Sequence, residues 1–204
     1  KDGIINEDQN LKRIILDEFS SRNKDFFYEL NSAFLENGFY IEIEKLQKIE
    51  KPIVVVNKFD SNSSNAFINP RNILYFGESS SAEIVEYSFS DSSQSYFLNK
   101  TMMMYLDDNS KVEHLSIENG SKSSFIFSNL KIKQNRESNF TTNSILMGGK
   151  LIRNNVHPIL DGDTSYSSIL GLYLPQHSQL MDNYMFVEHS KPHCGSRQLY
   201  KGLL

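Results

Sequence analysis

The chain has 204 residues, a net charge of −4 and 39% hydrophobic residues, among them 14 Phe and 10 Tyr. This length and aromatic content predict one or two folded domains and exclude an intrinsically disordered chain. The sequence has no basic run, no secretory signal and no apolar stretch long enough to cross a bilayer, so it predicts neither nucleic-acid nor membrane binding. One cysteine, Cys194, excludes an internal disulfide framework and favours a reducing, cytoplasmic setting.

Two helical patterns open the sequence. One apolar stripe covers residues 11–19 and follows Asp8, a candidate cap, and the second covers residues 26–34 and follows Asn23. Both stripes are typical of helices that pack one face against a core. The period then changes, because Phe39–Ile43 alternates with polar residues and predicts a strand.

From residue 52 onwards the pattern is one short strand after another. The predicted strands cover residues 52–56, 73–76, 84–89, 101–106, 112–117, 125–132, 144–147, 151–160, 168–173, 184–188 and 199–204. Regular short strands with few helical segments indicate a sandwich, a barrel or a solenoid. We therefore divide the chain into a small helical, α+β N-terminal region, residues 1–50, and a mainly β core, residues 51–204, which we expect to be incomplete at its C-terminal end.

The links between the predicted strands bear on how these strands pair. Two-residue hairpin signals are scarce, and the best of them are Asn119-Gly120 and Asp161-Gly162. Most links are rich in Ser and Asn instead, which favours coils stacked in parallel over strands that reverse direction. Periodicity by itself leaves the solenoid and the sandwich open.

The last residues, Gln198–Leu204, have the pattern of a strand that no cap or polar tail closes. An uncovered strand at the end of a sheet leaves backbone groups unpaired, and natural proteins cover such edges. We expect that more chain follows in the full protein or that a partner covers this edge. A chain ending at Leu204 is predicted to self-associate through it.

Motifs for nucleotide binding and for hydrolysis are absent. Gly148-Gly149-Lys150 lacks the spacing of a phosphate loop and is followed by Leu151, so we interpret it as a tight turn between two strands. No Gly-x-Ser-x-Gly sequence is present, and no nucleophile elbow is predicted.

A histidine- and cysteine-containing segment is the candidate metal site. His189, His193 and Cys194 carry ligand chemistry, and His177 or Asp182 could fold back as a fourth ligand. Pro192 argues against the helix that would align the two histidines four residues apart. The alternative interpretation is a polar loop in which Cys194 is structural.

Several stretches in the second half of the chain share the order and spacing of one known family. They are Leu151–Asn155, Leu160–Gly162, Leu170–Tyr173, Asp182-Asn183, His189, Pro192–Cys194 and Ser196–Gly202, with Asn69–Gly77, Gln134 and Ser138–Phe140 upstream. In these stretches the chain resembles the SufB/SufD family of iron–sulfur cluster assembly scaffold proteins, and within it the SufD type.

The resemblance implies a right-handed parallel β-helix after a helical N-terminal region, and it thereby decides between solenoid and sandwich. It implies a non-catalytic scaffold that supports cluster assembly and iron entry, with a SufB-like paralogue and a SufC-like ABC-type ATPase as partners, and it is compatible with a homodimer. The nascent iron–sulfur cluster and a reduced flavin belong to the complex, and no cofactor is expected to bind this chain stably.

The chain departs from the family by stopping just after Tyr200-Lys201-Gly202. In the family, the histidine implicated in cluster assembly and the segment that docks the ATPase come later. No catalytic or cluster-binding role is therefore carried over to any position here. Two rival functions stay open: a β-solenoid interaction module unrelated to iron–sulfur chemistry, and a metal-dependent enzyme that uses His189, His193 and Cys194.

Overall fold

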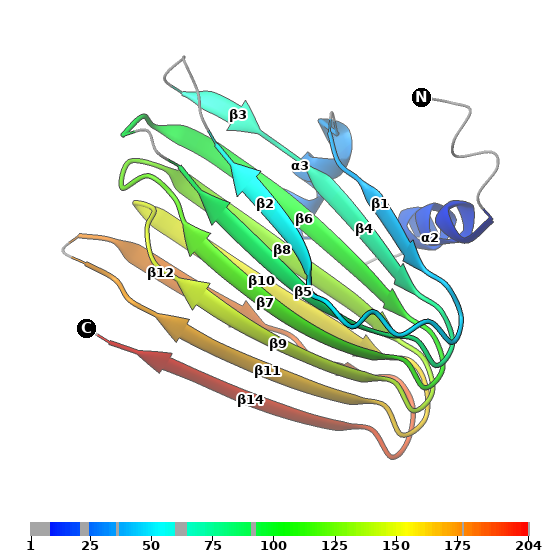
Figure 1. The fold of residues 1–204 in the computed structure, drawn as a ribbon. Coiled ribbons are helices and arrows are strands. Elements are labelled where there is room, and N and C mark those ends of the chain that lie inside the picture. Colours follow the sequence, from blue (N-terminus) through cyan, green and yellow to red (C-terminus); the bar gives the residue numbers. More distant parts are fainter. Residues whose placement is uncertain are drawn as a thin grey trace.

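The structure is a computed structural model, and it describes residues 9–20, 25–35, 37–59, 65–90, 93–176 and 178–203. Within these ranges two helices precede a long series of strands (Figure 1). The helices are α2 (Gln9–Ser20) and α3 (Phe26–Ala33), and the strands are β1 (Tyr40–Ile43), β2 (Ile53–Lys58), β3 (Ala66–Ile68), β4 (Arg71–Phe76), β5 (Ser81–Phe89), β6 (Tyr96–Leu106), β7 (Lys111–Asn119), β8 (Phe125–Gln134), β9 (Asn139–Leu146), β10 (Leu151–Leu160), β11 (Tyr166–Tyr173), β12 (Leu180–Met185), β13 (Glu188–His189) and β14 (Gly195–Gly202).

The strands form two sheets that face each other, and from β4 onwards the chain passes from one sheet to the other after nearly every strand (Figure 1). Sheet A has the order β1-β4-β6-β8-β10-β12, with β3 beside β6 and β13 beside β10. Sheet B has the order β14-β11-β9-β7-β5-β2. Neighbouring strands are parallel in both sheets. The predicted mainly β fold, a stack of parallel coils, is confirmed, and the sandwich alternative is wrong.

Successive coils stack in register. In sheet B, Ser81 pairs with Lys111, Lys111 with Asn139, Asn139 with Tyr166, and Tyr166 with Gly195. Each inward or outward position therefore repeats as a row of side chains that runs along the stack. The two hairpin candidates follow the ends of β7 and β10 and turn the chain into the opposite sheet, not back along its own.

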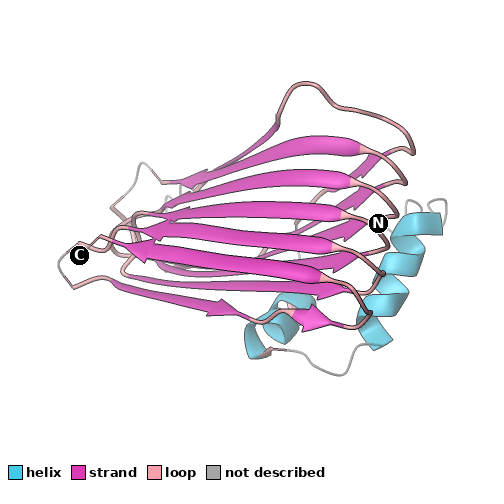
Figure 2. Ribbon diagram, turned by 90° about the horizontal axis from the view of Figure 1, so that it is seen from below, coloured by secondary structure: helices cyan, strands magenta, loops and turns pink. Residues whose placement is uncertain are grey.

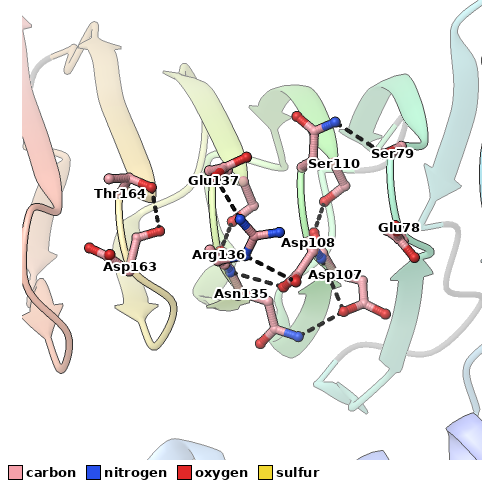
Figure 3. A network of polar contacts seen from close by, with 12 residues as sticks. Glu78, Ser79, Asp107, Asp108, Ser110, Asn135, Arg136, Glu137, Asp163 and Thr164 are labelled. Atoms are coloured by element: carbon pink, nitrogen blue, oxygen red, sulfur yellow. Dashed lines mark hydrogen bonds and ion pairs between the residues drawn. The ribbon is translucent and has the colours of Figure 1, made fainter.

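The same type of turn recurs in successive coils at one corner of the solenoid. Its third residue has a positive φ between 55° and 65° in successive coils, at Leu46, Ser79, Asn109, Glu137, Thr164 and His193. The backbone N–H of this residue donates to the next coil, for example from Asn109 to the Arg136 carbonyl at 2.8 Å. Figure 3 shows this corner, where the Asn135 amide and the Arg136 guanidinium bind Asp107 and Asp108 of the preceding coil.

The residue that follows the positive-φ position is a buried serine in four of these turns, at Ser80, Ser110, Ser138 and Ser165. The hydroxyl groups of Ser110, Ser138 and Ser165 donate to the carbonyl three residues earlier, at 2.6–2.9 Å. We call this row the serine ladder. In these three turns the hydroxyl closes its own turn and gives a buried carbonyl a side-chain donor, whereas the buried hydroxyl of Ser80 has no such partner.

The tight turn predicted at Gly148-Gly149-Lys150 lies between β9 and β10, as expected. Gly148 has a φ of 139°, and a Cβ there would lie 2.3 Å from the Gly120 carbonyl oxygen. The backbone of one coil therefore approaches the next so closely that a side chain cannot be accommodated.

The N-terminal helices lie on the outer face of sheet A (Figure 2). Ile14 of α2 packs against Tyr75 and Met103, and the Asn31 amide of α3 donates to Asn69 at 3.0 Å and to the Asn99 carbonyl at 2.9 Å. The small helical region is therefore confirmed. Strand β1, which also lies within residues 1–50, pairs with β4 and is therefore part of the stack.

The predicted cap Asp8 and the predicted start Asn23 lie outside the described residues. Helix α3 begins at Phe26, and the Asp25 side chain accepts a hydrogen bond from the Phe27 N–H at 2.8 Å, which is the contact of an N-cap.

Two apolar clusters fill the space between the sheets. The larger contains Ile43, Leu74, Phe76, Ala82, Ile84, Met102, Met104, Leu106, Val112, Leu130, Ile132, Phe140, Val156 and Ile169, and the smaller contains Tyr96, Leu98, Ile126, Leu146 and Ile152. Along each strand the two clusters are separated by buried polar residues, which we call the polar layer. Its members are Glu86, Ser88, Lys100, His114, Ser116, Glu118, Ser128, Thr142, Ser144 and Asn154.

Candidate functional site

The predicted metal ligands do not converge in the described part of the chain. His189 ends β13, is exposed, and has its Nε2 3.1 Å from the Ser196 hydroxyl. His193 is exposed at the positive-φ position of its turn. Asp182 forms an ion pair with Arg153 at 2.9 Å, and His177 lies outside the described residues. Across the described ranges, no three His, Cys, Asp or Glu side chains group closely enough to hold a metal ion.

Cys194 occupies the position of the serine ladder in the last described turn. Its thiol lies 3.2 Å from the Gly162 carbonyl and 3.3 Å from the Ser165 hydroxyl, and the side chain is partly buried. A thiol is slightly larger than a hydroxyl and is a weak donor, and here it contacts the Gly162 carbonyl of the preceding coil and, at 3.5 Å, the Pro192 carbonyl of its own turn. The structural role that the sequence suggested for Cys194 stays a prediction.

A buried charged group at the centre of the polar layer was not predicted. Lys100 of β6 points inward from sheet A, and its ammonium lies 3.0 Å from Glu86 Oε1 and 3.3 Å from the Ser88 hydroxyl. It also contacts Glu118 Oε1 of β7. The side chains of Lys100, Glu86 and Glu118 are at most 5% exposed.

The surrounding residues extend this network across neighbouring coils. The Asn57 amide donates to Glu86 at 3.0 Å, and His114 places its Nδ1 3.0 Å from the Thr142 hydroxyl and its Nε2 4.0 Å from Glu86. A cavity of about 10 Å³ lies beside His114, which is the space that one water molecule needs.

The two carboxyl groups of this cluster have pKa values that shift in opposite directions. Burial opposes ionisation of Glu86, but the Lys100 charge, His114 and hydrogen bonds from Lys100 and Asn57 outweigh burial and lower the pKa of Glu86. For Glu118, burial together with the charge of Glu86 outweighs Lys100 and raises the pKa from 4.5 to about 7.

The pKa values of the two basic residues of the group shift in opposite directions. Burial alone would lower the pKa of Lys100, but the two carboxylates raise it, so the ammonium stays charged. Burial lowers the pKa of His114 from 6.5 to about 4, and the imidazole is neutral near pH 7. The group can therefore hold one proton on Glu118 and release it near neutrality, at a position closed to solvent.

The sequence carried a signal for this group, but a weak one. In β5 the inward positions run Ala82, Ile84, Glu86 and Ser88, so strand alternation places Glu86 inside. Lys100 was left out because the predicted strand began at Thr101, whereas β6 begins at Tyr96. A lysine between two polar residues, here Asn99 and Thr101, is usually interpreted as a strand end or an outward residue.

A groove of about 580 Å³ lies on the outer face of sheet A between α3 and the strands β8, β10 and β12. Its lining includes Tyr28, Lys131, Arg153, His157 and Tyr184. Arg153 is paired with Asp182, and His157 lies 3.7 Å from the carboxylate of Glu188. The volume fits a small molecule, but these pairings leave no clear excess charge that would indicate its class.

The comparison with protein families decides the identity of this stack of coils. A family model described as "SUF system FeS cluster assembly, SufBD core domain" matches residues 59–204, which is most of the chain and includes the polar layer. The chain belongs to the SufB/SufD family. The resemblance noted in the sequence is thereby confirmed.

The chain is also similar to two curated proteins of iron–sulfur cluster assembly. It is 22% identical over 185 residues to the iron–sulfur cluster assembly protein SufD of Escherichia coli K12, a match that covers 88% of this chain and 43% of that protein. It is 31% identical over 61 residues to an iron–sulfur cluster assembly SufBD family protein of Mycobacterium leprae, which covers 30% of this chain and 16% of that protein. The chain thus spans less than half the length of the curated relatives it matches.

None of the helices in the described residues is long and apolar enough to cross a membrane.

Proposed function

We propose that this protein is a non-catalytic scaffold subunit of a SUF-type complex that assembles iron–sulfur clusters in the cytoplasm. The observation that carries the proposal is the match of residues 59–204 to the SufBD core domain, together with the similarity of 88% of the chain to a SufD protein. The cluster is the cargo of the complex and not a resident cofactor of this chain.

The arrangement of the side chains supports a scaffold more than an enzyme. Glu118 and His114, whose pKa values are strongly shifted, are buried between the sheets and are at most 3% exposed. Substrate could reach them only if the coils separated. The coils stack in register and present an extended, regular outer surface, which is what a scaffold offers to other subunits.

The partners that fit this role are a SufB-like paralogue and a SufC-like ABC-type ATPase. Both partners are proposed from the family model that matches the chain, since that model is described as a core domain of the SUF system for FeS cluster assembly.

Copurification tests the proposal. The tagged protein, expressed from its own gene, is purified from cells that also contain the SufB-like and SufC-like proteins. We expect both proteins to be retained with it. The same purification from cells that contain the SufC-like protein without the SufB-like one is the control, and we expect weaker retention there. Failure to retain the SufB-like protein would contradict the proposal.

A further inference from the structure

The small cavity in the polar layer lies between the two sheets, beside the buried ion pairs. Ser128 of β8 lines it from sheet A, and Glu86, His114 and Ser116 line it from sheet B. Each of these four residues is at most 8% exposed. The cavity has a volume of about 10 Å³, so whatever occupies it is as small as one water molecule and is shielded from bulk solvent.

The imidazole of His114 has a partner on one nitrogen only. Its Nδ1 lies 3.0 Å from the Thr142 hydroxyl. Its Nε2 is buried and has no hydrogen-bond partner among the described residues, and Glu86 Oε2 lies 4.0 Å away, which is too far for a hydrogen bond. Because an unpaired buried nitrogen destabilises a fold, His114 needs a hydrogen-bonding partner that the protein does not supply.

Two serines bring further polar groups to the same cavity. Ser116 follows His114 by two positions on β7, so both side chains point inward, and Ser128 faces the cavity from the opposite sheet. Within the described part of the chain, neither hydroxyl forms a hydrogen bond. A hydroxyl can both donate and accept, so each can bind a small polar molecule in either orientation.

Other side chains of the polar layer are already paired. The Ser88 hydroxyl accepts from the Lys100 ammonium at 3.3 Å, and the Asn154 amide donates to the Tyr200 hydroxyl at 3.2 Å. Glu118 Oε2 has no partner among the described residues, but Glu118 does not line the cavity. The cavity is therefore a place where several unpaired polar groups face one space.

We propose that this cavity is a binding site for one internal water molecule, held by His114 Nε2 and by the hydroxyls of Ser116 and Ser128. Three partners are the usual number for a buried water. Glu86 Oε2 is a fourth candidate, since two atoms 4.0 Å apart can share a water that lies about 2.8 Å from each. This inference does not depend on the role in cluster assembly.

The charges around the cavity favour a neutral occupant. Burial lowers the pKa of His114 to about 4, so its imidazole carries no charge near pH 7. The Lys100 ammonium lies 3.0 Å from Glu86 Oε1, and the two charges compensate each other. An ion placed in the cavity would therefore lack a counter-charge, whereas water can donate to one group and accept from another.

The water links parts of the solenoid that do not touch directly. It joins Ser128 of sheet A to His114 and Ser116 of sheet B, and through His114 it reaches Thr142 in the next coil. Because the site is closed to solvent, the water exchanges with bulk solvent only when the coils separate locally. Its residence time therefore measures how often this part of the stack opens.

A crystal structure of the unchanged chain at high resolution tests the site directly. We expect one ordered water molecule within about 3.2 Å of His114 Nε2 and of both serine hydroxyls. Density that shows no water there, with His114 Nε2 bonded directly to Glu86, would overturn the proposal. This measurement needs no variant, so it stands even where a substitution prevents folding.

Oxygen-17 magnetic relaxation dispersion tests the site in solution, because it counts water molecules that stay bound longer than the protein tumbles. Ser116→Val removes one partner and fills the cavity, and we expect this variant to hold one long-lived water fewer than the unchanged chain. Ser168→Val, on the outer face of sheet B, is the matched control and should leave the count unchanged. An equal count in the unchanged chain and in a folded Ser116→Val variant would refute the assignment.

Discussion

Replacement of Lys100 by methionine should strongly destabilise the solenoid. Met fills a similar volume but leaves Glu86 and Glu118 buried without their cation. At a separation of 3.0 Å, one such ion pair has a Coulomb energy of roughly 5–6 kcal/mol if the effective dielectric constant is about 20. Desolvation offsets much of this energy in the intact group, so the measured loss comes mainly from the uncompensated charges. We expect a loss of about 3–5 kcal/mol near pH 8.

The loss should shrink as the pH falls. In the folded variant we expect burial, no longer opposed by the charge of Lys100, to raise the pKa values of both carboxyl groups above 4.5. Each then contributes stability that is present below pH 4.5 and is lost as the pH rises through the folded pKa. Near pH 5 the variant binds protons on both groups, and we expect the loss to fall to about 1–2 kcal/mol, the cost of poorly satisfied neutral groups.

Urea unfolding followed by circular dichroism at the two pH values measures this loss. Lys133→Met is the matched control, because Lys133 is about one third exposed and its ion pair with Asp161 spans 3.6 Å. That change should cost less than about 1 kcal/mol at both pH values. If Lys100→Met cost no more than the control, or the same at both pH values, the assignment of a buried ionised group would be wrong.

The remaining predictions concern single positions in the polar layer and at the corner. The pKa of Glu118 is raised to about 7, so the stability that its protonated form contributes is lost as the pH rises from 4.5 through 7. This decline amounts to at most about 3 kcal/mol, and Glu118→Gln should remove it from the pH profile of stability. His114, with a pKa lowered to about 4, acts in the opposite sense, so a His114→Asn variant should lose less stability than the unchanged chain as the pH falls from 6.5 to 4. Thr164 has a φ of 57°, which a β-branched residue tolerates poorly, and Thr164→Asn should raise the unfolding midpoint by the equivalent of about 1 kcal/mol. Cys194→Ser should change stability by less than about 1 kcal/mol and leave cluster assembly by the complex intact, whereas Cys194→Ala, which removes the contact with the Gly162 carbonyl of the preceding coil, should cost more.

Most strands were predictable because one of their faces is buried. The predicted strand at residues 151–160 coincides with β10, and alternation located the cores of β5, β7 and β8. The predicted strand at residues 184–188 was less accurate, since β12 covers Leu180–Met185 and β13 covers Glu188–His189. The sequence-based prediction missed strand ends where polar residues face inward, because the alternation of apolar and polar residues does not mark those ends.

The pairing direction could not be derived from periodicity. Apolar and polar residues alternate along a strand in the same way in a parallel coil and in an antiparallel sandwich. The corner turns also use residues with no special turn propensity, such as Glu137 and Thr164. The serine that follows each of them is the local signal of this turn. Its repeat at the coil spacing is visible in the sequence only when the coils are already aligned.

The candidate site shows the same limit. His189, His193 and Cys194 attracted attention because their residue types bind metals, yet the corner turn holds His193 outward and Cys194 in the serine ladder. Lys100 and Glu118 lie 18 positions apart in the chain and meet because β6 and β7 belong to opposite sheets. No local pattern predicts a contact of that kind.

The central claim, that this protein supports iron–sulfur cluster assembly as a scaffold, is tested most directly by the cluster content of the complex. The SufB-like and SufC-like proteins are purified with and without this protein, under anaerobic conditions, and iron and acid-labile sulfide are measured per SufB-like subunit. The account predicts substantially more of both when this protein is present, and the same gain with Cys194→Ser in its place. Equal iron and sulfide with and without the protein would contradict it.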